Sequence, residues 1–395
     1  MLSSVELFAG AGGLALGLSQ AGFQHKAVVE LNTDACNTIR ANQEQRLNLV
    51  RDWPVFQEDV CGFSFDQIGE DVDLLAGGVP CQPWSLGGKH RGYEDQRNMF
   101  PQMLRAVLSL RPRAFIIENV KGLLRRSFAT YFQYITLMLS HPEIRRRANE
   151  DWPQHLSRLE KHHTSGKTRS LEYNVVYRLL NAANYGVPQK RERVFVVGFR
   201  SDLGIEWSFP EETHSVGALA ADQLSGAYWD RHGVSKKDRV LPRNTASGSE
   251  LFDDMKRLPW CTVRDALQGL PDPEKSDASK FHNHYYIAGA RSYPGHTGSR
   301  LDEPAKTLKA GDHGVPGGEN MIAFPSGKLR YLTVRESARV QTFPDEYMFK
   351  GSWTESMRQL GNAVPVALAK TIAANIRQHL RVSGVKQSRA ERNAV

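Results

Sequence analysis

The feature that most constrains the fold is an alternation of short apolar runs with helical patterns over residues 1 to about 125. This alternation is typical of βαβ units, in which helices join parallel strands. Helical patterns lie between the apolar runs, for example at Leu14–Gln20 and Phe100–Ser109. The predicted strands are Ser4–Phe8, Ala27–Glu30, Val55–Glu58, Val72–Ala76 and Ala114–Glu118. The sequence therefore predicts an α/β protein built on a mainly parallel sheet.

The composition changes twice along the chain. A polar, basic stretch at about 140–169 indicates a surface insertion, after which the strand pattern returns at Tyr173–Leu180 and Arg193–Phe199. From residue 200 to 325 the chain is rich in Gly, Pro, Ser, His and aromatic residues and has no sustained periodicity. We predict a large domain over residues 1–199 and a smaller, loop-rich domain over residues 200–325.

Residues 326–381 are predicted to return to the large domain. Thr333 and Glu336 have the spacing of a capping box at a helix start. A last helix is predicted from Pro365, a residue favoured in the first turn. Its apolar face carries Leu368, Ile372, Ile376 and Leu380. The polar segment 382–395 is predicted to be a disordered tail.

Charge and cysteine content narrow the class of protein. The net charge is +8 and the pI is near 9.3, which favours a polyanionic partner, although many unrelated proteins share this balance. The chain lacks both a secretory leader and a run of roughly 18 apolar residues, so a soluble, cytoplasmic protein is expected. The four cysteines form no CxxC pair, and we predict neither a metal site nor disulfides: Cys36, Cys61, Cys81 and Cys261.

A glycine-rich loop follows the first predicted strand. Gly10, Gly12 and Ala15 match the pattern GxGxxA, and Glu30 follows about 20 residues later. The glycines allow a ligand to approach the backbone, and Glu30 can accept hydrogen bonds from ribose hydroxyls. Asp59, at the end of the third strand, is suited to an adenine amino group. A tight turn without a ligand and a dinucleotide site both remain open, because this pattern alone is weak.

A cysteine lies in a proline-stiffened loop after the fourth strand. Cys81 falls within Gly77-Gly78-Val79-Pro80-Cys81-Gln82-Pro83-Trp84-Ser85, at a carboxyl strand end where open parallel sheets bind ligands. The alternative is a buried structural thiol, the usual state of a free cysteine. The polar and proline neighbours of Cys81 favour a reactive role.

Three charged residues follow the next strands. Glu118 comes directly after three apolar residues, so partial burial is expected to raise its pKa and let it hold a proton near neutral pH. Arg191 and Arg193, two positions apart, are predicted on one face of a strand, where they can bind a carbonyl or phosphate oxygen. The alternatives are that Glu118 caps a helix and that the arginines form a solvated basic face.

Taken together, five segments resemble one family. In chain order they are FAGAGG, PCQPWS, ENV, QKRERVFVVG and RESARVQTFPD followed by QLGNAVP. They are similar to the cytosine-C5 DNA methyltransferases of bacterial restriction–modification systems, over residues 4–125, 173–200 and 300–380. The resemblance implies a Rossmann-like sheet of the S-adenosylmethionine-dependent methyltransferase type. It also implies that residues 1–199 form the catalytic domain and residues 200–325 a target-recognition domain.

The resemblance also implies roles for individual residues. Cys81 would attack carbon 6 of a cytosine swung out of the duplex, and Glu118 would hold or protonate ring nitrogen 3. Arg193, with Arg191 nearby, would sit by the ring carbonyl, and Gln82 would fill the gap in the duplex. S-adenosylmethionine is the implied cofactor, and becomes S-adenosylhomocysteine. The implied cofactor residues are Phe8 (on the adenine), Ala9, Gly10, Gly12, Gly13, Glu30 (on the ribose), Leu31, Asp59 (on the adenine amine), Val60, Pro80, Asn362 and Ala363.

Double-stranded DNA is the implied partner, and the protein is expected to act as a monomer in a bacterial cytoplasm. A restriction endonuclease acting separately is a further expected partner, and an orphan enzyme is equally compatible with the sequence. Basic residues of the recognition domain are candidates for DNA contacts, each with ordinary surface charge as the alternative: Lys236, Lys237, Arg239, Arg243, Arg291 and Arg300.

Three other classes of protein compete with this interpretation. A related tRNA methyltransferase would share the catalytic core but usually has a shorter variable segment. A catalytically silent DNA-binding relative is disfavoured because Cys81, Glu118 and both arginines are present. A nicotinamide oxidoreductase would explain the glycine loop but gives no reason for the PCQ and GNAVP segments.

Overall fold

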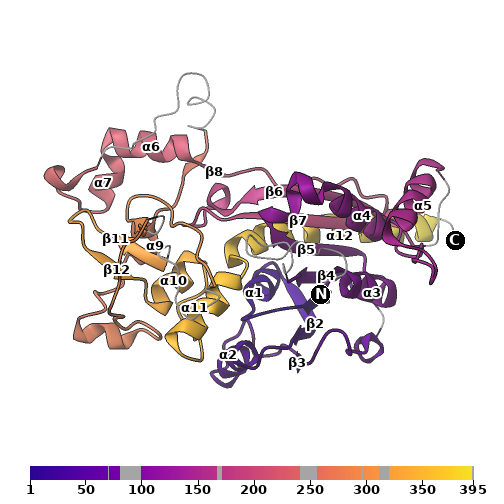
Figure 1. The fold of residues 1–395 in the computed structure, drawn as a ribbon, viewed down its shortest axis with the longest axis horizontal. Coiled ribbons are helices and arrows are strands. Elements are labelled where there is room, and N and C mark those ends of the chain that lie inside the picture. Colours follow the sequence, from indigo (N-terminus) through magenta and orange to yellow (C-terminus); the bar gives the residue numbers. More distant parts are fainter. Residues whose placement is uncertain are drawn as a thin grey trace.

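The computed structural model describes residues 1–69, 71–80, 99–166, 171–240, 256–294, 297–310 and 320–393. A large domain holds the central sheet, and a smaller domain lies beside it (Figure 1). None of the described helices has both the length and the apolar character of a membrane span.

The large domain is organised around a seven-stranded sheet of order β3-β2-β1-β4-β5-β7-β6. Only β7 runs against its two neighbours, β5 and β6, while the other pairs are parallel. All seven strands overlap those predicted from the sequence, with ends shifted by a few residues. Their bounds are β1 Leu2–Leu7, β2 Phe23–Glu30, β3 Val55–Gln57, β4 Leu74–Gly78, β5 Ala114–Val120, β6 Tyr173–Asn181 and β7 Glu192–Arg200.

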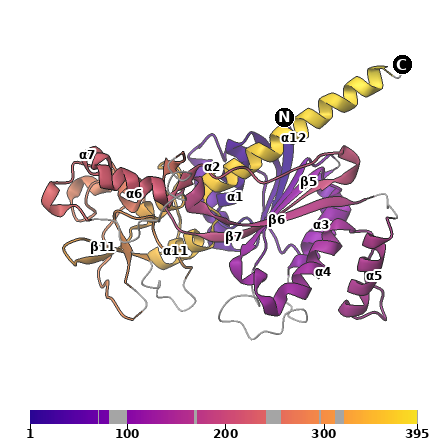
Figure 2. The same cartoon turned by 90° about the horizontal axis from the view of Figure 1, so that it is seen from above.

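Helices cover both faces of the sheet, which explains the nearly continuous apolar character of its strands. Successive residues of a strand point to opposite faces. Thus Phe115 and Ile117 pack with α3 (Phe100–Leu110) and α4 (Ala129–Ser140), whereas Ile116 packs with α1 (Gly13–Gln20) and α12 (Val366–Asn393). A further helix, α2 (Thr33–Glu44), follows β2. Figure 2 shows α3 and α4 on one side of the sheet and α12 on the other.

The last helix, α12, packs against the large domain. The four predicted face residues of α12, from Leu368 to Leu380, are fully buried. A Cβ added at Gly17 of α1 would lie 2.4 Å from Ala369 Cβ, so the two helices are in close contact. The predicted disorder after Arg381 differs from the structure, which continues α12 to Asn393. The segment 382–393 contains Lys, Gln, Arg, Ala and Glu, which favour helix even where the sequence is polar.

The basic insertion contains a helix that packs on the large domain. Helix α5 (Trp152–Thr164) begins with a capping box between Asp151 and Gln154. Leu156 and Leu159 are buried in the same cluster as α4. The insertion therefore shares the hydrophobic core of the large domain, although most of its residues are polar.

The smaller domain has short elements and long connections, as the sequence predicted. The three-stranded sheet β10-β11-β12 and the pair β8-β9 hold it together. The hairpin β11–β12 spans the predicted boundary between residues 325 and 326. The bounds are β8 His214–Ser215, α6 Val216–Ser225, α7 Ala227–Arg231, β9 Leu258–Pro259, α9 Val263–Leu267, β10 Ser299–Arg300, β11 Met321–Ala323 and β12 Leu329–Tyr331. The helices α10 Val334–Val340 and α11 Trp353–Asn362 follow and pack against α1.

Candidate active site

The glycine loop joins β1 to α1 at the carboxyl end of the sheet. Its backbone is left-handed at three positions, with φ of 57° at Phe8, 56° at Gly10 and 83° at Gly12. Glycine adopts this conformation readily, whereas phenylalanine does so only at a cost in strain. A Cβ added at Gly10 would meet no atom within 4 Å. The loop therefore offers open space beside its backbone, as a bound ligand requires.

Glu30, the last residue of β2, fastens this loop. Its Oε2 atom accepts a hydrogen bond of 2.7 Å from the Gly10 N–H, and Oε1 accepts one of 2.7 Å from the Asn32 N–H. A carboxylate has about four lone-pair positions, so the two backbone bonds leave capacity for hydroxyl donors. Glu30 therefore retains the acceptor capacity that a ribose would require.

The other predicted cofactor residues of this edge differ in exposure. Leu31 is 62% exposed and provides an apolar surface next to Glu30. Asp59 is exposed, and its Oδ1 atom accepts a 2.8 Å hydrogen bond from the Cys61 N–H. Val60 is buried, and its carbonyl accepts a hydrogen bond from Arg105. The Asp59 carboxylate is thus open to solvent, and the hydrogen bond from Arg105 to Val60 fixes the backbone next to it.

The return segment packs directly on the glycine loop. A Cβ added at Gly13 would lie only 2.4 Å from the Val364 carbonyl oxygen, so only glycine fits there. Ala363 is buried with Ala9 and Ala11 in one apolar cluster, and Asn362 is exposed at the end of α11. Sequence reasoning missed Tyr347, whose hydroxyl donates a 2.7 Å hydrogen bond to the Ala11 carbonyl. No sequence motif indicates this contact, because 336 residues separate the two partners.

A buried ion pair lies near the carboxyl end of β5. Glu118 is 7% exposed, and its Oε1 atom is 2.9 Å from Arg193 Nε. The contact lacks the direction of a hydrogen bond, so among the described residues Oε1 has charge compensation but no donor. Burial raises the pKa of Glu118, and the charges of Arg193 and Arg191 only partly offset this effect. Such a carboxyl group keeps its proton to a higher pH than an exposed glutamate does.

The alternative that Glu118 caps a helix receives no support. The following 3₁₀ helix, Lys121–Leu124, has Val120 as its N-cap and no side-chain capping bond. The pairing of Glu118 with Gly78 of β4 instead places the carboxylate beside the start of the cysteine loop. A Cβ added at Gly78 would lie 3.8 Å from Glu118 Oε2.

Arg191 is buried beneath this pair rather than on a solvated face. Its exposure is 1%, and its guanidinium donates hydrogen bonds to the carbonyls of Leu308, at 3.3 Å, and Gly361, at 2.8 Å. Burial lowers the pKa of Arg191, and the positive charge of Arg193 adds to this shift. Arg191 therefore joins the return segment to the start of β7, while Arg193 faces Glu118.

Cys81 and Gln82 lie outside the described residues, but the chain leading to them is described. Asn119 Nδ2 donates a 3.2 Å hydrogen bond to the Val79 carbonyl, which fixes the loop entrance next to Glu118. Pro80, the last described residue before Cys81, is exposed. The three described thiols are poor nucleophiles, because burial raises the pKa to about 11 for both Cys36 and Cys261 and also raises that of Cys61.

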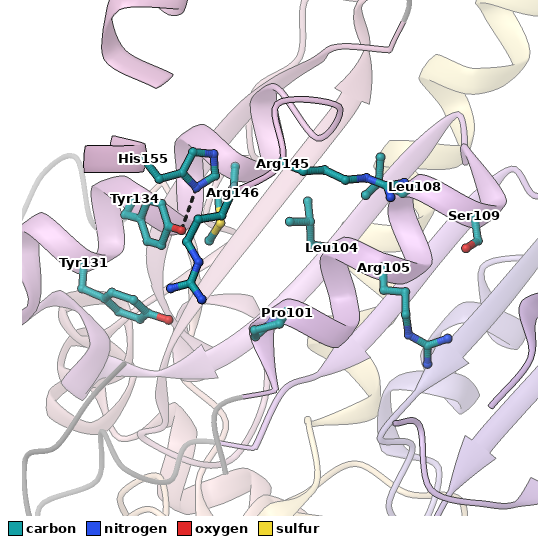
Figure 3. Close-up of a pocket in the computed structure, with 11 residues that line it drawn as sticks. Pro101, Leu104, Arg105, Leu108, Ser109, Tyr131, Tyr134, Arg145, Arg146 and His155 are labelled. Atoms are coloured by element: carbon teal, nitrogen blue, oxygen red, sulfur yellow. Dashed lines mark hydrogen bonds between the residues drawn. The ribbon is translucent and has the colours of Figure 1, made fainter. Parts of the chain in front are cut away.

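A cavity of about 370 Å³ lies between α3, α4 and the basic insertion (Figure 3). Its lining is largely apolar, and none of its lining residues is a predicted site residue. Figure 3 shows Tyr134 beside His155 in the lining of this cavity, where the Tyr134 hydroxyl and His155 Nδ1 are 2.9 Å apart. The cavity is therefore separate from the residues that the sequence singled out for catalysis.

The model of the family described as C-5 cytosine-specific DNA methylase matches residues 2–142 and 155–378. The chain belongs to this family. The methylase is 33% identical to the Type II methyltransferase M.PspPI of Psychrobacter sp., over 94% of this chain and 77% of that protein. It is 30% identical to M.NgoMIV of Neisseria gonorrhoeae, over 96% of this chain and 98% of that protein.

Solved structures agree on the fold of this methylase. A DNA modification methyltransferase encoded within an E. coli prophage superposes with a TM-score of 0.61 and 21% identity, over 96% of this chain and all of that one. Dnmt2 methyltransferase of S. pombe superposes with a TM-score of 0.56 and 15% identity, over 95% of this chain and 98% of that one. The predicted fold class and family are thus confirmed. The protein is an enzyme that methylates carbon 5 of cytosine in DNA.

Proposed function

We propose that the methylase works through a covalent bond between Cys81 Sγ and carbon 6 of a cytosine rotated out of duplex DNA. The observation that carries this proposal is the buried pair of Glu118 and Arg193 beside the entrance of the Cys81 loop. A thiolate is a suitable nucleophile because it adds to an electron-poor ring and also leaves it readily. The motif containing Cys81 supports the assignment.

The roles of the other residues follow from where charge develops. When Cys81 adds to carbon 6, electron density moves toward carbon 5 and into the ring toward nitrogen 3. Glu118 holds a proton at nitrogen 3, and Arg193 orients Glu118 and faces the ring carbonyl. After carbon 5 has gained its substituent, loss of the carbon 5 proton restores the 5,6 double bond and expels the Cys81 thiolate. Gln82 occupies the space left in the duplex.

S-adenosylmethionine is the cofactor proposed for the glycine loop, and when bound it supplies an electrophilic methyl group. The loop fits such a group because Gly10 faces open space while Glu30 retains acceptor capacity beside it. Phe8 and Leu31 supply apolar surface for the adenine, and Asp59 an acceptor for its amine. The remaining wall is assigned to Ala9, Gly12, Gly13, Val60, Pro80, Asn362 and Ala363.

The smaller domain is proposed to read the DNA target. In the described part of it, Lys236, Lys237 and Arg291 are exposed cations suited to phosphates. Arg239 and Arg300 are weaker candidates, because they pair with Asp230 at 2.5 Å and Glu303 at 3.2 Å. Arg243 lies outside the described residues. We further propose that the enzyme acts as a monomer on cytoplasmic DNA and protects sites of a separate restriction endonuclease.

Duplex DNA containing 5-fluorocytosine provides the direct test. Fluorine cannot leave carbon 5 as a proton does, so protein incubated with this DNA and S-adenosylmethionine is expected to form an adduct that survives denaturant. Bisulfite sequencing of DNA from cells expressing the protein then identifies the target. Methylation of adenine, or transfer to tRNA but not to duplex DNA, would contradict the proposal.

Replacement of Glu30 by glutamine tests the cofactor site. We expect the affinity for S-adenosylhomocysteine to fall by about 10- to 100-fold, because hydrogen bonds to a charged acceptor contribute roughly 1.5–3 kcal/mol. Isothermal titration calorimetry measures this change. Glu58→Gln, an exposed carboxyl group just after β3, is the matched control and should bind normally. Equal affinity in both variants would remove Glu30 from the site.

A further inference from the structure

Two histidines of the basic insertion and a glutamate that follows it meet at the edge of the large domain. His141 follows the C-terminus of α4, His162 lies in the last turn of α5, and Glu172 precedes β6. Glu172 Oε1 is 3.2 Å from His141 Nδ1 and 3.3 Å from His162 Nε2. One donor atom from each residue lies within 4.8 Å of the other two. His141 is buried and the other two are partly buried.

The distances from Glu172 Oε1 to the two imidazole nitrogens match those between neighbouring ligands of one metal ion. Two bonds of about 2.0–2.1 Å meeting at a tetrahedral angle place their donor atoms about 3.3 Å apart. Two imidazoles and one carboxylate suit Zn²⁺ or a similar transition metal, whereas Mg²⁺ and Ca²⁺ prefer oxygen ligands throughout. We propose that His141 Nδ1, His162 Nε2 and Glu172 Oε1 bind one Zn²⁺ ion, with water completing the coordination.

A neighbouring histidine supports this assignment. His141 Nε2 is 2.9 Å from His163 Nδ1. If His141 Nδ1 binds the metal, its Nε2 carries the proton and donates this hydrogen bond to His163. Metal-binding histidines usually donate their second ring N–H in this way, which fixes the tautomer and the ring orientation. His163 is therefore proposed as a positioning residue for His141.

The site is structural, because it lies at the end of the sheet opposite the catalytic pair. Tyr173, next to Glu172, pairs with Arg200, whereas Arg193 pairs with Leu180. The seven residue-to-residue steps from Tyr173 to Leu180 span about 23 Å at roughly 3.3 Å each. The ion would join the ends of α4 and α5 to the start of β6, which Figure 2 shows near the outer edge of the large domain. This inference is independent of the proposed catalytic roles.

Metal binding by the whole protein tests the proposal. After treatment with a chelator and dialysis, Zn²⁺ is titrated calorimetrically and counted by mass spectrometry. The wild type should bind one Zn²⁺ ion. The affinity should fall at least about 10-fold in His162→Gln and in Glu172→Gln, and about 10-fold in His163→Gln. Glu160→Gln on the same helix and His282→Gln, an exposed histidine elsewhere, are matched controls and should bind as the wild type does.

Zinc bound by cysteine thiols would be present equally in all variants, so it can be distinguished from zinc bound at this site. Equal affinity and stoichiometry in the wild type and in a His162→Gln, Glu172→Gln double variant would overturn the proposal. If the variants do not fold, Co²⁺ binding by the wild-type protein provides a second measurement. The wild-type protein is expected to show the visible absorption of a tetrahedral Co²⁺ site, displaced by Zn²⁺, and absence of this band would likewise overturn the proposal.

Discussion

Replacement of Cys81 by alanine is expected to abolish methyl transfer to DNA, a loss of roughly 10⁴-fold or more. The variant lacks the sulfur that adds to carbon 6, and without that addition carbon 5 of cytosine is not nucleophilic. The rate is measured with radiolabelled S-adenosylmethionine and duplex DNA. Adduct formation with 5-fluorocytosine DNA should disappear together with the rate, because both require the same bond.

Other cysteines of the chain provide matched controls for this variant. Cys61 is exposed and Cys261 is partly buried, and both have raised pKa values. Their alanine variants should therefore retain the rate and the adduct. Binding of S-adenosylhomocysteine by Cys81→Ala at wild-type affinity would show that the variant is folded. Methyl transfer at full speed by that folded variant would refute covalent catalysis at position 81.

The sheet could be predicted from the sequence because its strands are buried on both faces. A segment such as Ala114–Glu118 has Phe115, Ile116 and Ile117 in succession, so its apolar side chains point to both faces of the sheet. Such a strand can bury them only between two layers of helices. Motifs that follow such strands then lie at one edge of the sheet. For this reason the sequence alone predicts that Gly10, Glu30 and Glu118 lie near the ligand edge of the sheet.

Contacts between distant segments could not be predicted in this way. Arg191 was expected on one face of a strand, but the structure buries it against the carbonyls of Leu308 and Gly361. The histidine cluster was missed for a similar reason. His141, His162 and Glu172 have no motif spacing, and only the packing of α4 and α5 at the start of β6 brings them together.

Replacement of Glu118 by glutamine is expected to lower kcat by about 10²- to 10⁴-fold, the usual contribution of a general acid. Glutamine keeps the size of the side chain but cannot deliver a proton to nitrogen 3. Single-turnover methylation of duplex DNA measures the effect. Glu192→Gln is the matched control, because Glu192 is an exposed carboxyl group on β7 that pairs with Lys121 at 2.8 Å, and its loss should leave the rate unchanged.

The pH dependence of the two enzymes distinguishes proton transfer from a purely structural role of Glu118. Burial raises the pKa of this carboxyl group, so its protonated form persists to higher pH than in an exposed glutamate. If the protonated form is the active one, kcat/KM of the wild type falls as pH rises through that pKa. Glutamine does not titrate, so the same decline should be absent from Glu118→Gln at its lower rate. A decline of equal midpoint in both enzymes would assign the titration to another group, and an undiminished rate in the variant would remove Glu118 from the chemistry.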